Sequence, residues 1–65
     1  MERHSEMFKV YPDVVSVEQL MEMLQIGKVL AYRLITEGKI KAVKIGRAYK
    51  IAKRNVVEYL LNEHR

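Results

Sequence analysis

The spacing of the apolar residues changes at Gly38, and this change limits the folds open to the chain. Before Gly38, apolar residues recur every three or four positions, as they do on helices. After Gly38 they alternate with lysines in the stretch V-K-I-G-R-A-Y-K-I, residues 43–51, as they do in strands. Helical spacing returns at about residue 54. Since the 65 residues include no cysteine, one small apolar core has to hold the fold, and we expect a single α+β domain.

A short first helix is expected to begin after Ser16. Ser16 is a favourable N-cap, and Gln19, three positions later, can complete a capping box. Val15 and Leu20 can close a hydrophobic staple around the same turn. The apolar pattern then continues to residue 24 or 25, where the first helix should end.

A second helix is predicted after an interruption of three residues, the connection length of two helices that cross steeply. It should run from Lys28 to Glu37 and end at Gly38 in the left-handed conformation. Its apolar side is expected to consist of Leu30, Ala31, Leu34 and Ile35. The other side combines a cation, a phenol, a hydroxyl and a small apolar group, which suits phosphates, base edges and thymine methyls in a major groove. Its members are Lys28, Val29, Tyr32, Arg33 and Thr36. Considered alone, this side fits an ordinary surface helix equally well.

Two short strands are predicted on either side of Gly46. A two-residue loop would place apolar Val43 and charged Lys50 opposite each other on one face. A three-residue loop, residues 46–48, instead pairs apolar residues with each other on the inner face, and we expect this register. The expected pairs are Ile45 with Tyr49 and Val43 with Ile51.

The expected register collects cations on the outer face of the hairpin. Lys44 would stand directly opposite Lys50, although like charges in this position repel each other. Lys41 would lie at the base, and Arg47 would lie beside Gly46 at the tip. Such a ridge could straddle a phosphate backbone or send Arg47 into a minor groove. The alternative is that the lysines only protect a sheet edge from aggregation.

The charge of the chain is unevenly distributed. Residues 27–55 carry nine Lys or Arg against one Glu, a net charge of +8, whereas residues 1–26 sum to −3 and residues 56–65 to −1. A basic segment interleaved with apolar residues at structural periods is typical of proteins that bind polyanions, nucleic acids above all.

The residues do not form a catalytic or metal-binding arrangement. His4 and His64 lie near the two ends of the sequence, and Ser5 and Ser16 have no evident His and Asp partners. We therefore expect no enzyme, no metal, no cofactor and no small-molecule substrate. The apolar runs are too short to span a membrane and the first residues do not resemble a secretion signal, so we expect a cytoplasmic protein.

The two ends of the domain are predicted as follows. Residues 1–9 should form a flexible tail and residues 10–65 the folded domain, with Phe8, Val10 and Tyr11 as a short extended lead-in before Pro12. A third helix should run from residue 53 or 54 to residue 63 and pack across the first two helices. Its apolar side is expected to contain Val56, Tyr59 and Leu60, with Val57 and Leu61 beside them.

Four stretches of the chain form a recognisable pattern: S-V-E-Q-L-M-E-M-L-Q-I-G at 16–27, L-A-Y-R-L-I-T-E-G-K-I at 30–40, V-K-I-G-R-A-Y-K-I at 43–51 and V-V-E-Y-L at 56–60. Together they resemble the excisionase-like, MerR-type family of small winged helix-turn-helix DNA-binding domains. The resemblance covers about 45 residues. It implies two N-terminal helices, a two-stranded hairpin wing and a C-terminal helix. It also implies that the second helix enters the major groove, with Tyr32 and Arg33 at matching positions, while the Gly46-Arg47 tip of the wing approaches the neighbouring minor groove.

The chain departs from the family pattern in three places. Gln25 replaces the usual small residue of the turn, and Gly27 replaces the Ser or Thr that normally caps the second helix. Gly27 therefore removes a side-chain cap and leaves amide groups that could meet a phosphate. Val29 and Leu30 stand where the family often has polar residues, so either base readout is more apolar there or a partner protein contacts them.

The resemblance further implies a recombination directionality factor, which binds repeated sites, self-associates cooperatively on DNA and assists a tyrosine or serine integrase in excising a mobile element. A small transcriptional regulator with the same DNA-binding mode is the first alternative. A protein-interaction module that uses Val29, Leu30 and Tyr32 is the second. The sequence leaves open the target site, the recombinase partner and the number of copies on DNA.

Overall fold

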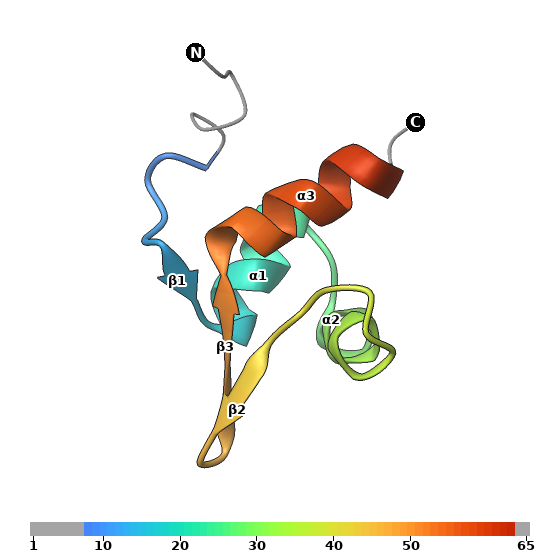
Figure 1. Ribbon diagram of the computed structural model, residues 1–65. Helices are drawn as coiled ribbons and strands as arrows, with labels where there is room; N and C mark the ends of the chain where they lie inside the picture. Colours follow the sequence, from blue (N-terminus) through green and yellow to red (C-terminus); the bar gives the residue numbers. More distant parts are fainter. Residues whose placement is uncertain (1–7, 64–65) are drawn as a thin grey trace.

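The computed structural model describes residues 8–63 as three helices and a three-stranded antiparallel sheet (Figure 1). This architecture confirms the predicted α+β winged helix-turn-helix. The elements in chain order are β1 (Val14–Val15), α1 (Val17–Leu24), α2 (Lys28–Thr36), β2 (Val43–Ile45), β3 (Ala48–Ala52) and α3 (Lys53–Glu63).

The capping box predicted at the start of α1 is present. The Gln19 amide donates to the Ser16 hydroxyl at 3.2 Å, and the Ser16 amide donates to the Gln19 side-chain oxygen at 3.0 Å. At the other end of α1, Gln25 adopts the left-handed conformation and its amide donates to the Met21 carbonyl. The chain then extends through Gly27, which caps α2 without a side-chain hydrogen bond, as expected from the missing hydroxyl.

The end of α2 is a Schellman motif centred on Gly38. Gly38 has a φ of 78°, the left-handed conformation predicted for it. Its amide donates to the Ile35 carbonyl at 3.1 Å, and the Lys39 amide donates to the Leu34 carbonyl at 2.9 Å. This closed end stops the helix and turns the chain toward β2.

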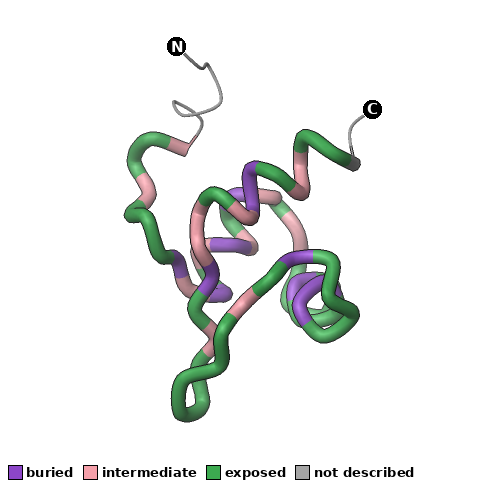
Figure 2. The backbone as a smooth tube through the Cα atoms, in the orientation of Figure 1, coloured by how far each residue is buried: buried purple, intermediate pink, exposed green. Residues whose placement is uncertain are grey.

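The core lies where the helices meet the sheet, and Figure 2 shows the buried positions gathered at this junction. It joins residues of β1, β3 and all three helices, including Leu20 of α1, Ile51 of β3 and Val56 of α3. On α2, Ala31, Leu34 and Ile35 are buried as predicted, but Leu30 is 41% exposed. Leu30, on the predicted apolar side, therefore stays outside the core.

A first strand was not predicted from the sequence. Val15 pairs with Ile51 and Val14 with Ala52, so β1 completes the sheet in the order β1-β3-β2. Two residues are too few for an alternating pattern to be recognised. The extended lead-in expected before Pro12 is instead a turn, in which the Tyr11 amide donates to the Phe8 carbonyl at 2.9 Å. Residues 1–7 of the predicted tail lie outside the described residues.

Lys53, at the start of α3, ties this N-terminal turn to the end of β3. Its Nζ donates to the Tyr11 carbonyl at 3.0 Å and to the Phe8 carbonyl at 3.4 Å, and its backbone amide donates to the Asp13 carbonyl at 2.7 Å. The Tyr11 hydroxyl in turn donates to Glu22 of α1 at 3.2 Å. Desolvation and the neighbouring Glu22 carboxylate raise the pKa of the Tyr11 phenol. The turn is therefore fastened to both α1 and α3.

Candidate nucleic-acid interface

The exposed side of α2 carries the five residues that the sequence suggested for base and phosphate contacts. Val29 is 75% exposed and Tyr32 37% exposed, while Lys28, Arg33 and Thr36 are also exposed. The Thr36 hydroxyl donates to the Arg33 carbonyl at 3.3 Å, which leaves its oxygen lone pairs to accept a hydrogen bond from outside. The structure thus brings these five residues to one helix face.

The register of the hairpin differs from the prediction. Val43 pairs with Lys50, Lys44 with Tyr49 and Ile45 with Ala48, so the loop has two residues, Gly46 and Arg47. Gly46 has a φ of 65°, whereas Arg47 keeps a negative φ. A positive φ at the first central residue alone is the signature of a type II′ turn, whose twist matches that of the flanking strands. This favourable turn outweighs the expected burial of Val43 and Ile45, and the three-residue loop was wrong.

The observed register reverses the faces on which the residues of β2 lie. Lys44 shares the inner face with Tyr49 and Ile51, while Val43 and Ile45 lie on the outer face, 62% and 60% exposed. The predicted juxtaposition of Lys44 and Lys50 is therefore absent, because the two lysines point to opposite faces of the hairpin. Arg47 stays at the exposed tip, as predicted.

A chain of ring contacts joins the hairpin to α2. The Tyr32 ring of α2 meets the Tyr49 ring of β3 edge to face, with 5.9 Å between the ring centroids and an interplanar angle of 66°. The Nζ of Lys44 lies over the Tyr49 ring, 5.7 Å from its centroid. The exposed side of α2 and the inner face of the wing therefore form one continuous surface, here called the front surface, that carries Tyr32, Arg33, Lys44 and Tyr49.

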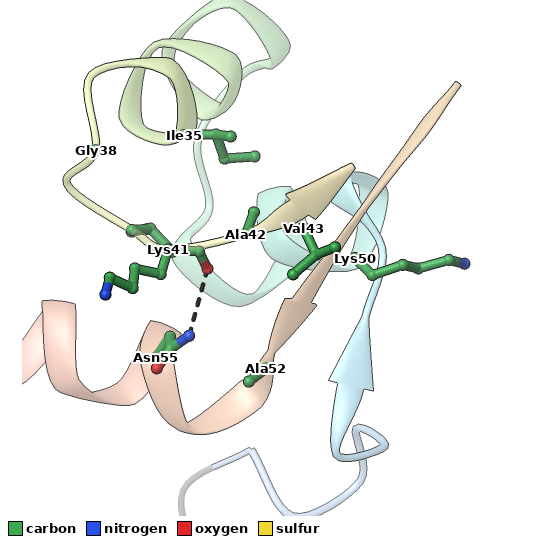
Figure 3. A pocket seen from close by; sticks show the side chains of 9 residues that line it. Ile35, Gly38, Lys41, Ala42, Val43, Lys50, Ala52 and Asn55 are labelled. Carbon is green, nitrogen blue, oxygen red and sulfur yellow. Dashed lines mark hydrogen bonds between the residues drawn. The ribbon is translucent and has the colours of Figure 1, made fainter. Parts of the chain in front are cut away.

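Lys41 and Lys50 line a different part of the molecule. They border an open pocket between the end of α2, the segment leading into β2 and the start of α3 (Figure 3). Asn55 of α3 donates from its side-chain amide to the Lys41 carbonyl at 3.4 Å, so it secures the base of the wing. In Figure 3 the two lysine side chains extend in opposite directions. The wing cations are thus divided between two faces and do not form one ridge.

A family model described as a helix-turn-helix domain matches residues 14–64, most of the chain. The chain belongs to this excisionase-like helix-turn-helix family. Comparison with curated proteins and with solved structures gave no match.

Membership of the helix-turn-helix family identifies a DNA-binding protein and gives the elements their roles. In a helix-turn-helix domain the second helix is the recognition helix. In this chain α2 is the second helix, and residues 25–27 form the turn before it. Domains of this family are typically not enzymes. Within residues 8–63 no helix is long and apolar enough to cross a membrane, and no three His, Cys, Asp or Glu side chains gather as metal ligands would.

One residue of the front surface was missed by the sequence reasoning. Tyr49 was expected on the inner face only as a core partner of Ile45, whereas it contacts Tyr32 and Lys44. The signal was present in the Gly-Arg dipeptide at 46–47, because glycine followed by any residue is the typical loop of a type II′ hairpin. Adopting that loop would have placed Lys44 across from Tyr49.

Proposed function

We propose that this helix-turn-helix protein is a sequence-specific, double-stranded-DNA-binding protein of the excisionase type, with residues 10–65 as the binding domain. The observation that carries the proposal is the front surface, on which the exposed side of α2 and one face of the wing are continuous through Tyr32 and Tyr49. A helix in the major groove and a wing on the adjacent backbone require such continuity.

In the proposed complex α2 reads the bases. We assign a bidentate contact with guanine to Arg33, hydrogen bonds with base edges or phosphates to Tyr32 and Thr36, and contact with a thymine methyl to Val29. Lys28, in the first turn of α2, adds a phosphate contact beside the amides that Gly27 leaves without a side-chain cap.

The wing is proposed to hold the DNA backbone. Lys44 lies on the front surface and Arg47 at the tip, where the left-handed Gly46 lets the turn approach closely. Lys41 and Lys50 face elsewhere, so they contribute chiefly through the electrostatic field around the wing. A net charge of +8 over residues 27–55 supports this assignment.

The biological role proposed is that of a recombination directionality factor. Copies of the protein bind repeated sites side by side, associate cooperatively and assist a tyrosine or serine integrase. An excision assay with a recombinase encoded beside this protein separates that role from transcriptional regulation, the alternative with the same binding mode. Stimulated excision supports the proposal, and repression of a neighbouring promoter without any effect on excision favours the regulator.

DNA recognition itself is tested by selection from a pool of random duplexes, followed by a salt titration on the recovered sequence. We expect a short motif, in direct repeats if binding is cooperative, and a steep linear loss of log affinity with log salt concentration. No enrichment and negligible affinity at moderate salt would instead favour a protein-interaction module, in which the exposed Val29 and Leu30 with Tyr32 dock a partner protein.

Two arginine variants test the division of labour between helix and wing. Arg33→Ala should relax sequence preference by about 1–3 kcal/mol at one base pair. Arg47→Ala should weaken binding to selected and random duplexes alike and reduce the salt slope by about one ion. Equal losses of both variants on both kinds of duplex would contradict the assignment.

A further inference from the structure

Tyr49 joins the two parts of the front surface, because its ring contacts both Tyr32 of α2 and Lys44 of β2. It belongs to β3, the middle strand of the sheet, and its half-buried side chain packs against the core cluster that contains Ile51. Tyr49 pairs with Lys44 of β2, and Ile51, two residues further along β3, pairs with β1 and is fully buried, so the strand is held on both sides next to Tyr49. The Tyr49 ring can therefore restrain the orientation of an element that packs against it.

The other side of this contact is α2, the short helix that carries Tyr32. α2 has nine residues, of which Ala31, Leu34 and Ile35 are buried, and its first turn lacks a side-chain cap. Its exposed side has to meet DNA in one orientation, because a small displacement of a bidentate side chain breaks its hydrogen bonds. Tyr32 is the residue through which this side of α2 reaches the wing.

We propose that Tyr49 is a positioning residue for DNA readout: its edge-to-face contact with Tyr32 fixes the orientation of α2 relative to the wing. Lys44 supports the arrangement from β2, with its ammonium group over the Tyr49 ring. The inference rests on the proposed DNA-binding function. Its consequence is that sequence preference depends on a residue of the sheet that need not touch a base.

The test compares three variants by the ratio of their affinities for the selected duplex and for a scrambled duplex. Tyr49→Leu removes the ring and should lower this ratio roughly 3- to 10-fold, the change in affinity that corresponds to the loss of one aromatic pair. Tyr49→Phe keeps the ring contact and should retain the wild-type ratio. Tyr59→Leu is the matched control, because Tyr59 is another half-buried tyrosine, placed on α3, that packs against the same core.

The outcomes separate positioning from simpler roles. An unchanged ratio for Tyr49→Leu would overturn the proposal, and so would an equal loss on both duplexes, which would mark a backbone contact. A loss in Tyr49→Phe as large as in Tyr49→Leu would assign the effect to the hydroxyl and also overturn it. Thermal unfolding of each variant ensures that the affinities compare folded proteins.

A measurement without DNA keeps this inference distinct from the proposed function. In the NMR spectrum of the free protein, the Tyr32 ring protons should shift in Tyr49→Leu, which removes a neighbouring ring, and stay in place in Tyr59→Leu. Unmoved Tyr32 resonances in Tyr49→Leu would show that the contact is not formed and would end the inference. If the shifts appear but the wild-type protein selects no DNA, the ring contact stands and the proposed function fails.

Discussion

Gln25 holds a backbone conformation that few side chains adopt without cost. Its φ of 57° and ψ of 50° place it in the left-handed region, where a Cβ atom crowds the following carbonyl oxygen. The conformation ends α1 and redirects the chain toward Gly27 within three residues. The sequence indicated that Gln25 replaces the usual small residue at this position. The structure shows that Gln25 adopts the left-handed conformation there, which is strained for a residue with a Cβ atom.

Replacing Gln25 with glycine should therefore stabilise the protein. We expect Gln25→Gly to raise the free energy of unfolding by about 0.5–1 kcal/mol, the relief of the left-handed strain less the greater entropy of the unfolded chain. Chemical denaturation measures the change. Glu37→Gly is the control, because Glu37 is exposed at the end of α2 with a φ of −87° and should lose stability on the same substitution. A Gln25→Gly protein no more stable than wild type would contradict this account.

Among the elements, the helices were predictable and the wing only in part. Local signals determine where the helices begin and end. Two such signals, the capping box at Ser16 and the left-handed conformation of Gly38, were predicted and confirmed. The register of the wing depends instead on a competition between turn geometry and burial. Judged by burial alone, Val43 and Ile45 belonged inside, yet the type II′ turn places them outside. β1 could not be found, because a two-residue strand is defined only by its partner.

The two faces of the wing lead to a prediction about its lysines. Lys44→Gln should weaken DNA binding several-fold and reduce the salt slope by about one ion, because it removes a cation from the front surface. Lys50→Gln makes the same change of charge on the other face of the same hairpin and should have a smaller effect on both quantities. Salt titrations of both variants on the selected duplex provide the comparison. A loss at Lys50 equal to or greater than that at Lys44 would mean that the outer face of the wing meets the DNA.

On the scale of the whole molecule, the fold is closed by contacts between its N-terminal segment and the junction of β3 with α3. β1 pairs with β3, and Lys53 at the start of α3 donates to backbone carbonyls of the N-terminal turn. A lysine in the first turn of a helix opposes the helix dipole, so its place there requires a compensating contact. The Phe8 and Tyr11 carbonyls supply that contact. The charge of Lys53 thus supports the fold, although Lys53 also belongs to the basic segment of residues 27–55.

Removing this contact should destabilise the whole domain. We expect Lys53→Met to lower the free energy of unfolding by about 1–2 kcal/mol, since two carbonyls lose a charged donor. For a domain of this size the melting temperature would fall by about 4–8 °C per kcal/mol. Thermal unfolding of Arg54→Met, which removes the neighbouring exposed cation, is the control. Equal melting temperatures for the two variants would show that the Lys53 contacts add no stability.

The pairing of β1 with β3 also means that neither half of this protein contains a complete sheet. If the backbone were opened in the turn at residues 25–27, one fragment would hold β1 and α1, and the other would hold α2, the hairpin and α3. The second fragment would carry every proposed DNA contact but lack the strand that flanks β3. DNA binding would then depend on the association of the two fragments, and the domain could be made into a split reporter whose signal requires β1 to pair again with β3.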